Sequence, residues 1–97
     1  TSMVKSAING ITISLAAEWA PNIRVNCISP SLFKSNMSSK FFSSEKSIER
    51  ISNNHPLKRT GQTNDISSLI NFLISDESSW ITGQNISVDG GLSTLKI

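Results

Sequence analysis

One stretch, Ile23-Arg24-Val25-Asn26-Cys27-Ile28-Ser29-Pro30, constrains this chain more than any other. Its nearly continuous apolar run is rich in strand-favouring and small residues, which predicts a short buried strand over 23–28. Pro30 has no backbone N–H, so we expect it to end the strand. A helical pattern precedes the strand, and a serine-rich loop, a second helix and a second strand follow it.

This order of elements is typical of part of a parallel α/β sheet. A right-handed crossover would place the second strand beside the first and parallel to it. Ligands of such sheets bind just beyond the carboxyl ends of the strands. We therefore expect the functional site around residues 29–37.

Length and composition limit what the chain can be. Its 97 residues suffice for one small domain, and an apolar share of 37% leaves much surface to be covered by a partner or by the rest of a larger domain. The net charge of +2 is spread along the chain, which argues against a nucleic-acid partner. No apolar run is long enough to span a membrane. The single cysteine, Cys27, excludes an internal disulfide and fits a cytoplasmic protein.

The first segment predicts a helix over 2–19. Its apolar residues recur at helical spacing and form one stripe, made of Val4, Ile8, Ile11, Leu15 and Trp19. Gly10 in mid-helix costs about 1 kcal/mol relative to alanine. We expect it to mark the close approach of another helix, from this chain or from a second copy.

The segment from Ser29 to Asn54 is the least regular. Its phenylalanines argue against a plain linker, so we expect a mobile lid with a short helix near 45–51. His55 then starts an extended turn, and we expect it at the surface or in a loop, because no second histidine is present to build a metal site.

The rest of the chain predicts one more helix and one more strand. Thr63 or Asn64 caps a helix that ends near Ser75-Asp76, and Asp65 suits its positive N-terminus. A loop over 78–84 leads to a strand over 85–88, and Asp89-Gly90-Gly91 ends that strand in a turn.

Taken together, these motifs resemble the C-terminal part of a short-chain dehydrogenase/reductase, close to the 3-oxoacyl-carrier-protein reductase type. The resemblance covers nearly the whole chain and rests on ordered motifs: Lys5-Ser6-Ala7, Leu15-Ala16-Ala17-Glu18-Trp19-Ala20-Pro21, Ile23-Arg24-Val25-Asn26, Ser29-Pro30, His55-Pro56-Leu57-Lys58-Arg59-Thr60-Gly61, Asp65-Ile66, Ile81-Thr82-Gly83-Gln84 and Val88-Asp89-Gly90-Gly91. It implies an α/β fold, the C-terminal part of a Rossmann-type doubly wound parallel sheet. Residues 1–97 then form a single partial domain, and we expect the dinucleotide-binding half to be absent.

The resemblance also implies a chemistry. The family pairs a general acid/base tyrosine with a lysine in the pattern Tyr-x-x-x-Lys. Lys5 matches the lysine, and Thr1 stands at the tyrosine position in a chain with no tyrosine. A threonine hydroxyl is a far weaker acid than a phenol and does not replace it. Three further residues are implied at the nicotinamide end of the cofactor, NAD or NADP: Pro30, Phe33 and Ser35.

Two functions remain open on this basis. The chain is part of an NAD(P)-dependent oxidoreductase that interconverts a small carbonyl and an alcohol, and by itself it is inactive and binds no cofactor. Alternatively, it is a non-catalytic, self-associating module. In both cases we expect a homo-oligomer joined through helix 2–19 and the C-terminal strand. Without family knowledge Lys5 reads as a solvated surface lysine and Ser35 as one serine of a serine-rich loop.

Overall fold

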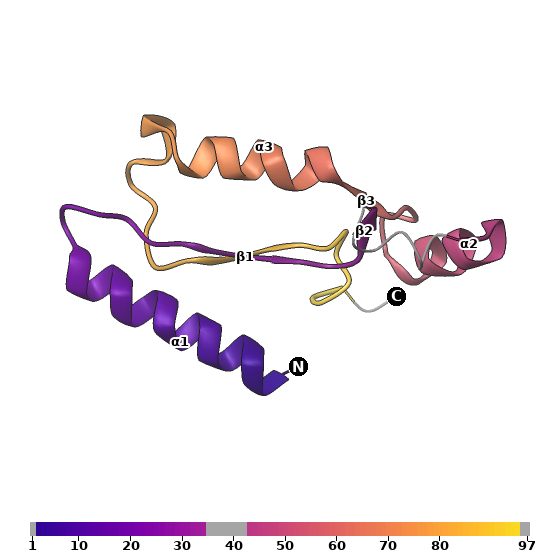
Figure 1. Ribbon diagram of the computed structural model, residues 1–97, viewed down its shortest axis with the longest axis horizontal. Coiled ribbons are helices and arrows are strands. Elements are labelled where there is room, and N and C mark those ends of the chain that lie inside the picture. The colour runs from indigo at the N-terminus through magenta and orange to yellow at the C-terminus, as the bar shows by residue number, and fades with distance from the viewer. Residues whose placement is uncertain (1, 35–42, 96–97) are drawn as a thin grey trace. The chain divides into compact units, whose positions relative to one another are not determined.

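The computed structural model describes residues 2–34 and 43–95, so Thr1, residues 35–42 and residues 96–97 lie outside it. The elements in chain order are α1 (Ser2–Trp19), β1 (Cys27–Pro30), β2 (Phe33–Lys34), α2 (Glu45–Asn54), β3 (Gly61–Gln62), α3 (Thr63–Leu73), the short 3₁₀ helix η2 (Asp76–Ser78) and β4 (Asn85–Val88), as Figure 1 shows. The chain divides into two compact units, residues 1–29 with 70–86 and residues 30–69 with 87–97. The expected lid falls largely on residues 35–42, outside the described part.

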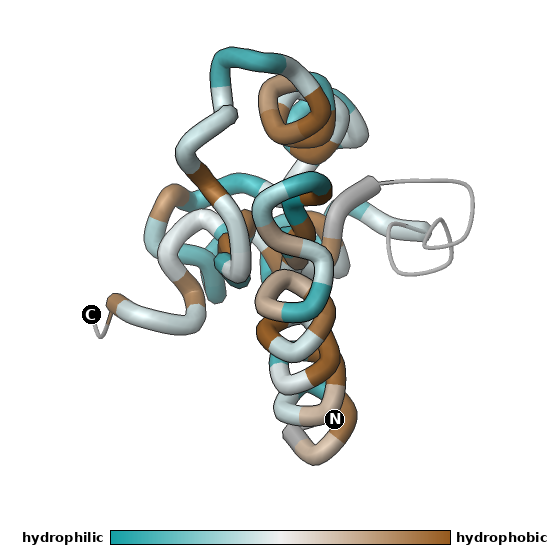
Figure 2. The backbone as a smooth tube through the Cα atoms, turned by 90° about the vertical axis from the view of Figure 1, so that its left-hand side faces the viewer, coloured by the Kyte–Doolittle hydropathy of each residue, from teal (hydrophilic) through white to brown (hydrophobic). Residues whose placement is uncertain are grey.

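Helix α1 has the predicted bounds, and most of the apolar stripe that we expected this chain to leave uncovered is exposed. Thr12 and Ala16 are its buried residues, only 6% and 5% exposed. The Thr12 hydroxyl donates to the Ile8 carbonyl at 2.8 Å, which satisfies it within the helix. The apolar positions that colour α1 brown in Figure 2 are mostly open to solvent. They include Val4, Ile8 and Ile11, each about half exposed.

Strands β1 and β4 are neighbours in one sheet. The Cys27 N–H donates to the Gln84 carbonyl at 2.8 Å, and the Ser31 N–H donates to the Val88 carbonyl at 3.1 Å. Both partners advance together along the chain, so the strands are parallel, which confirms the α/β class. β1 ends at Pro30, as expected, although the next backbone N–H, that of Ser31, still bonds to β4. The backbone N–H of Ser31 points toward β4, and successive backbone N–H groups of a strand point to opposite sides. The nitrogen of Pro30 therefore faces away from β4, so its missing N–H costs no hydrogen bond between the two strands.

Arg24 ties the segment before β1 to the end of α3 within the first unit. Its guanidinium donates to the carbonyls of Leu73 at 2.9 Å, Ser75 at 3.2 Å and Ile81 at 3.2 Å. The last carbonyls of a helix have no partner inside the helix, so a cation with several donors suits this position. The buried Ser78 hydroxyl donates to the Leu73 carbonyl as well, at 2.9 Å. The interior of this unit is therefore held by polar contacts to backbone as much as by apolar packing.

The second unit contains a strand pair that the sequence did not suggest. β2 and β3 pair in parallel, with Phe33 opposite Gly61 and Lys34 opposite Gln62. Helix α2 is confirmed and runs beyond the expected end. Its N-cap residue, Ser44, accepts a hydrogen bond from the Ser47 N–H at 3.1 Å.

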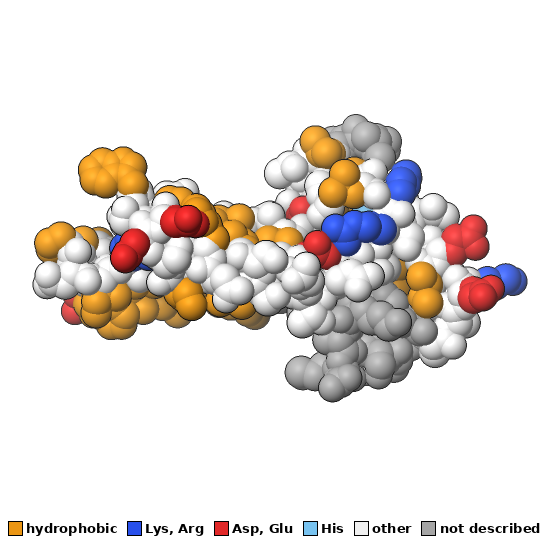
Figure 3. All heavy atoms as spheres, turned by 90° about the horizontal axis from the view of Figure 1, so that it is seen from above, with side chains coloured by type: hydrophobic (Ala, Val, Ile, Leu, Met, Phe, Trp, Pro, Cys, Tyr) orange, Lys and Arg blue, Asp and Glu red, His pale blue; other side chains and the backbone are white. Residues whose placement is uncertain are grey.

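Two surface features complete the fold. A side chain added at Gly10 would meet nothing within 4 Å, so the close approach expected there involves no other part of this chain that the structure describes. Trp80 is 98% exposed, and Figure 3 shows other apolar side chains open to solvent. No helix in the described residues combines the length and hydrophobicity that a membrane span requires.

Candidate functional site

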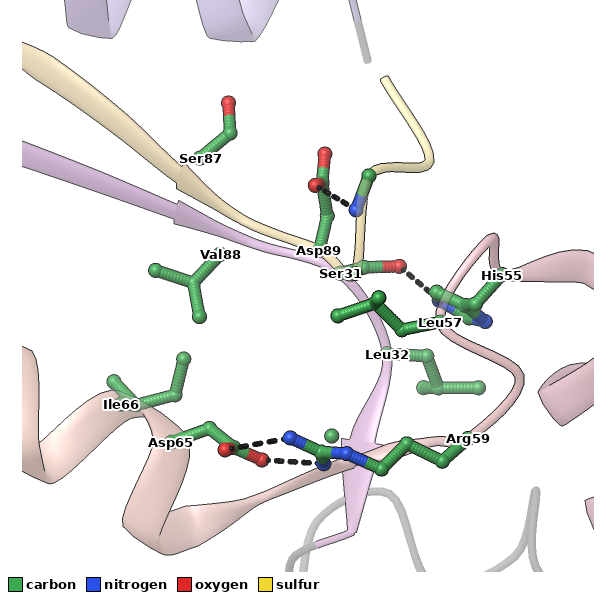
Figure 4. A pocket seen from close by; sticks show the side chains of 13 residues that line it. Ser31, Leu32, His55, Leu57, Arg59, Asp65, Ile66, Ser87, Val88 and Asp89 are labelled. Atoms are coloured by element: carbon green, nitrogen blue, oxygen red, sulfur yellow. Dashed lines mark hydrogen bonds and ion pairs between the residues drawn. The ribbon is translucent and has the colours of Figure 1, made fainter. Parts of the chain in front are cut away.

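A pocket of about 310 Å³ lies in the second unit, at the ends of β1 and β4 (Figure 4). This is the place where parallel α/β sheets bind ligands, and the volume falls at the lower end of the range for small-molecule sites. Thirteen residues line it: Ser31, Leu32, His55, Leu57, Arg59, Gly61, Asp65, Ile66, Ser87, Val88, Asp89, Gly90 and Gly91.

A chain of two hydrogen bonds runs along one wall of the pocket. The His55 Nδ1 atom lies 2.7 Å from the Ile51 carbonyl oxygen, and its Nε2 atom lies 2.9 Å from the Ser31 hydroxyl. A carbonyl oxygen only accepts, so Nδ1 carries the hydrogen in this contact. In the neutral ring Nε2 is then the acceptor, and the Ser31 hydroxyl donates to it (Figure 4).

His55 lies in the loop after α2, as expected, but it is buried there, with 5% of its surface exposed, and not at the surface. It follows the last residue of α2 in extended conformation and acts as the C-cap, with its backbone N–H donating to the Ser52 carbonyl. A buried imidazole needs partners for both nitrogens, and Ile51 and Ser31 supply them. The sequence does not reveal the contact between His55 and Ser31, because the two residues lie 24 positions apart.

An ion pair stands at the opposite wall. Arg59 donates to both carboxylate oxygens of Asp65, at 2.9 Å and 3.0 Å, and the Gln62 N–H donates to one of them at 2.7 Å. The hydrogen bond from Arg59, followed by the one from Gln62, lowers the pKa of Asp65 to about 2. Because the two charges satisfy each other, this wall offers a ligand no free cation.

Asp89 closes the end of the pocket at the turn after β4. Its oxygens accept from the N–H groups of Gly91 at 3.0 Å and Ser93 at 3.1 Å. The pKa of Asp89 lies below its usual value, chiefly because the Ser93 side chain hydrogen-bonds to it, with further contributions from these N–H groups and from attraction to His55. Gly90 and Gly91 have positive φ angles, which confirms the predicted turn.

The residues singled out from the sequence are only partly visible. Lys5 is exposed on α1 in the first unit, while Pro30, also exposed, directly precedes the pocket residue Ser31 in the second unit. The backbone of Phe33 forms β2. Thr1 and Ser35 lie outside the described residues. In the part of the chain that the structure describes, no three His, Cys, Asp or Glu side chains gather as metal ligands would.

Known proteins are similar to this chain in sequence and in structure. A family model described as enoyl-(acyl carrier protein) reductase matches residues 1–93. A tropinone reductase homolog of Arabidopsis thaliana is 42% identical over 90 residues, which is 92% of this chain and 34% of that protein.

Two solved structures are similar over nearly the whole chain. 4-Hydroxyisoleucine dehydrogenase complexed with NADH superposes with a TM-score of 0.86 at 39% identity, covering 95% of this chain and 38% of that one. YwfH, an NADPH-dependent reductase involved in bacilysin biosynthesis, also reaches a TM-score of 0.86, at 34% identity, covering 98% of this chain and 40% of that one. The chain thus spans about a third of the length of the curated relative, 34%, and slightly more of the two solved chains.

Proposed function

The chain belongs to the short-chain dehydrogenase/reductase family, and on this premise we propose that a protein carrying it transfers hydride between NAD or NADP and a small carbonyl or alcohol. The observation that carries the proposal is the likeness, at TM-score 0.86 and 39% identity, to a dehydrogenase complexed with NADH. Tropinone is a ketone and 4-hydroxyisoleucine is a secondary alcohol, so the names of two similar proteins support this substrate class.

In this proposal Lys5 binds the nicotinamide ribose, and Pro30, Phe33 and Ser35 line the nicotinamide end of the site. Pro30 supports that role by its position at the carboxyl end of a parallel strand. A bound nicotinamide cofactor would supply or accept the hydride. We place the protein in the cytosol, on the ground that its one cysteine, Cys27, is a free thiol.

We propose further that the 97-residue chain alone is inactive. It contains no tyrosine, and Thr1 stands where the family carries its proton donor. A threonine hydroxyl cannot act as a phenolic acid near neutral pH. The residues proposed for cofactor contact also lack a phosphate-binding helix N-terminus, which provides the main anchor for a dinucleotide.

Two measurements test these statements. Purified chain mixed with NADH or NADPH and a panel of small ketones should oxidise neither cofactor above the blank. Calorimetric titration with each cofactor should show no saturable binding. Turnover that a Lys5→Met variant loses, or one-to-one cofactor binding, would refute the proposed inactivity.

The oxidoreductase assignment itself is tested on a protein that carries this chain together with a cofactor-binding segment. If DNA upstream of Thr1 encodes an in-frame segment with a glycine-rich turn, the protein expressed from it should reduce small ketones with NADH or NADPH. Failure of that protein to bind either cofactor would refute the assignment.

A second candidate function is self-association. The exposed stripe of α1, formed by Val4, Ile8 and Ile11, is apolar, and the residues that the structure describes leave it about half exposed. Such a stripe on a small chain marks an interface. We propose that a second copy covers it, with a contribution from β4 at the C-terminal end.

A further inference from the structure

The hydrogen-bonded pair of Ser31 and His55 has no part in the hydride transfer proposed above. We propose that Ser31 is a nucleophile that His55 polarises, and that it reacts in the pocket with small neutral electrophiles of the organophosphonate class. Serine alone is a weak nucleophile, and an adjacent base in hydrogen-bond contact is what activates it.

His55 is held in the form that a base requires. Its Nδ1 hydrogen points to the Ile51 carbonyl at 2.7 Å, so the Nε2 lone pair faces the Ser31 hydroxyl at 2.9 Å. Both distances lie within the range for a nucleophile, its base and a group that orients the base. The ring needs no rearrangement before it accepts the proton.

The Nδ1 side of the His55 ring faces the C-terminal end of α2. Ile51 supplies one of the last carbonyls of α2, a helix of ten residues, and the C-terminal end of a helix attracts a cation. The Ile51 carbonyl thus takes the place at Nδ1 that a carboxylate takes in a catalytic triad, as a weaker acceptor.

The pocket selects the kind of electrophile. Leu32, Leu57 and Val88 give it apolar walls within a volume of about 310 Å³. The nearby charges are already satisfied, since Arg59 is paired with Asp65 and Asp89 accepts from backbone N–H groups. A small neutral compound therefore fits better than an anion or a nucleotide.

The same geometry argues for one modification per chain rather than turnover. Turnover of an ester requires donors aimed at the developing oxyanion. The N–H groups of Ser31 and Leu57 are bonded to the carbonyls of Val88 and Gly90, and those of Gly91 and Ser93 are bonded to Asp89. These four donors are thus committed to the fold.

The reaction balances without an oxidant or a second reactant. With an alkyl fluorophosphonate, the Ser31 oxygen forms a bond to phosphorus, the phosphorus–fluorine bond breaks and fluoride leaves. The hydroxyl proton passes to Nε2 of His55 and from there to water.

The experiment is intact-mass and peptide mapping of the chain after incubation with an alkyl fluorophosphonate. We expect a single adduct on Ser31 that is absent in Ser31→Ala and absent when the chain is denatured in urea. His55→Gln should slow labelling at least about tenfold, because a positioned base contributes on the order of 10² or more. Ser68→Ala removes an exposed serine hydroxyl outside the pocket and should label like the unaltered chain.

His55→Gln replaces a buried side chain and can misfold, so a second measurement uses the unaltered chain. Nitrogen NMR of the imidazole should show the hydrogen on Nδ1. No adduct on Ser31, an adduct whose rate is unchanged in a folded His55→Gln variant, or a ring with its hydrogen on Nε2 would each overturn the proposal.

Discussion

The contacts of Arg24 allow a quantitative prediction about stability. Its guanidinium donates to three carbonyls, those of Leu73, Ser75 and Ile81, at 2.9–3.2 Å. A hydrogen bond from a charged donor contributes about 1.5–3 kcal/mol when partly buried. The three bonds share one cation and two are long, so we expect Arg24→Met to lower the free energy of unfolding by about 3 kcal/mol in total rather than by three full bonds.

Methionine is the informative replacement because it keeps an unbranched stem and removes only the donors. Arg24→Lys retains the charge but not the planar fork, so it should recover about half of the loss. Arg50→Met is the matched control, since Arg50 is exposed on α2. It should change stability by less than about 0.5 kcal/mol.

The assay is urea unfolding followed by circular dichroism at one fixed chain concentration, because association shifts apparent stability. With a slope near ~1.5 kcal/mol per molar urea, the midpoint of Arg24→Met should fall by about 2 M. If Arg24→Met is already unfolded without urea, the loss is at least as large as the free energy of unfolding of the unaltered chain. If Arg24→Met unfolds at the same midpoint as the Arg50→Met control, the three contacts do not stabilise the fold and the reasoning fails.

Three further predictions follow from single positions. The carboxyl of Asp65 has a pKa lowered from 3.8 to about 2, so its ion pair stabilises the fold above the unfolded-state pKa and loses that effect as the pH falls through about 2. Thermal unfolding should therefore depend less on pH between 4 and 2 in Asp65→Asn than in the unaltered chain, and an equal dependence would argue against the pair. Gly10→Ala adds a methyl group in open space and should stabilise the isolated chain by about 1 kcal/mol. Gly91→Ala, at φ +90° and with its Cβ 2.8 Å from Leu95, should destabilise the chain by about 1–3 kcal/mol, and equal urea midpoints for the two variants would contradict both expectations. If the proposed homo-oligomer forms through α1, Ile11→Asp should convert it to monomer in sedimentation equilibrium, because the variant places a carboxylate in an apolar interface, and Ile11→Ala should do so less. A chain that is monomeric without substitution would rule out the proposed interface.

The sequence predicted best what depends on local pattern. Helix α1 has the expected bounds because apolar residues recur at helical spacing along its whole length. Strand β4 has the expected bounds because a loop precedes it and a glycine turn follows it. The apolar stripe of α1 was expected to stay uncovered, and Val4, Ile8 and Ile11 are exposed. Periodicity did not reveal that the small residues Thr12 and Ala16 are the ones that become buried.

The candidate site was less predictable because its contacts join distant positions. The pocket lies next to Pro30 at the carboxyl end of β1, the region where the sequence predicts a site. The pairing of β2 with β3, two residues each, carries no periodic signal. His55 was misjudged because a lone histidine in a sequence shows no partner, while in the fold Ser31 and Ile51 satisfy both of its nitrogens.

The separation of the paired strands governs the order in which the chain can fold. The Val25 N–H donates to the Thr82 side chain 57 positions later, and the Gln84 N–H donates to Asn26 across 58 positions. Closing a loop of that length costs about 3–4 kcal/mol in chain entropy by the logarithmic rule alone. During synthesis the ribosome releases residue 26 long before residue 84. Helix α1 and strand β1 therefore emerge before β4, the strand that pairs with β1, has been made. The buried face of α1, with Thr12 and Ala16, is thus open during synthesis, whereas the apolar stripe of Val4, Ile8 and Ile11 can meet a neighbouring copy both before and after the sheet forms.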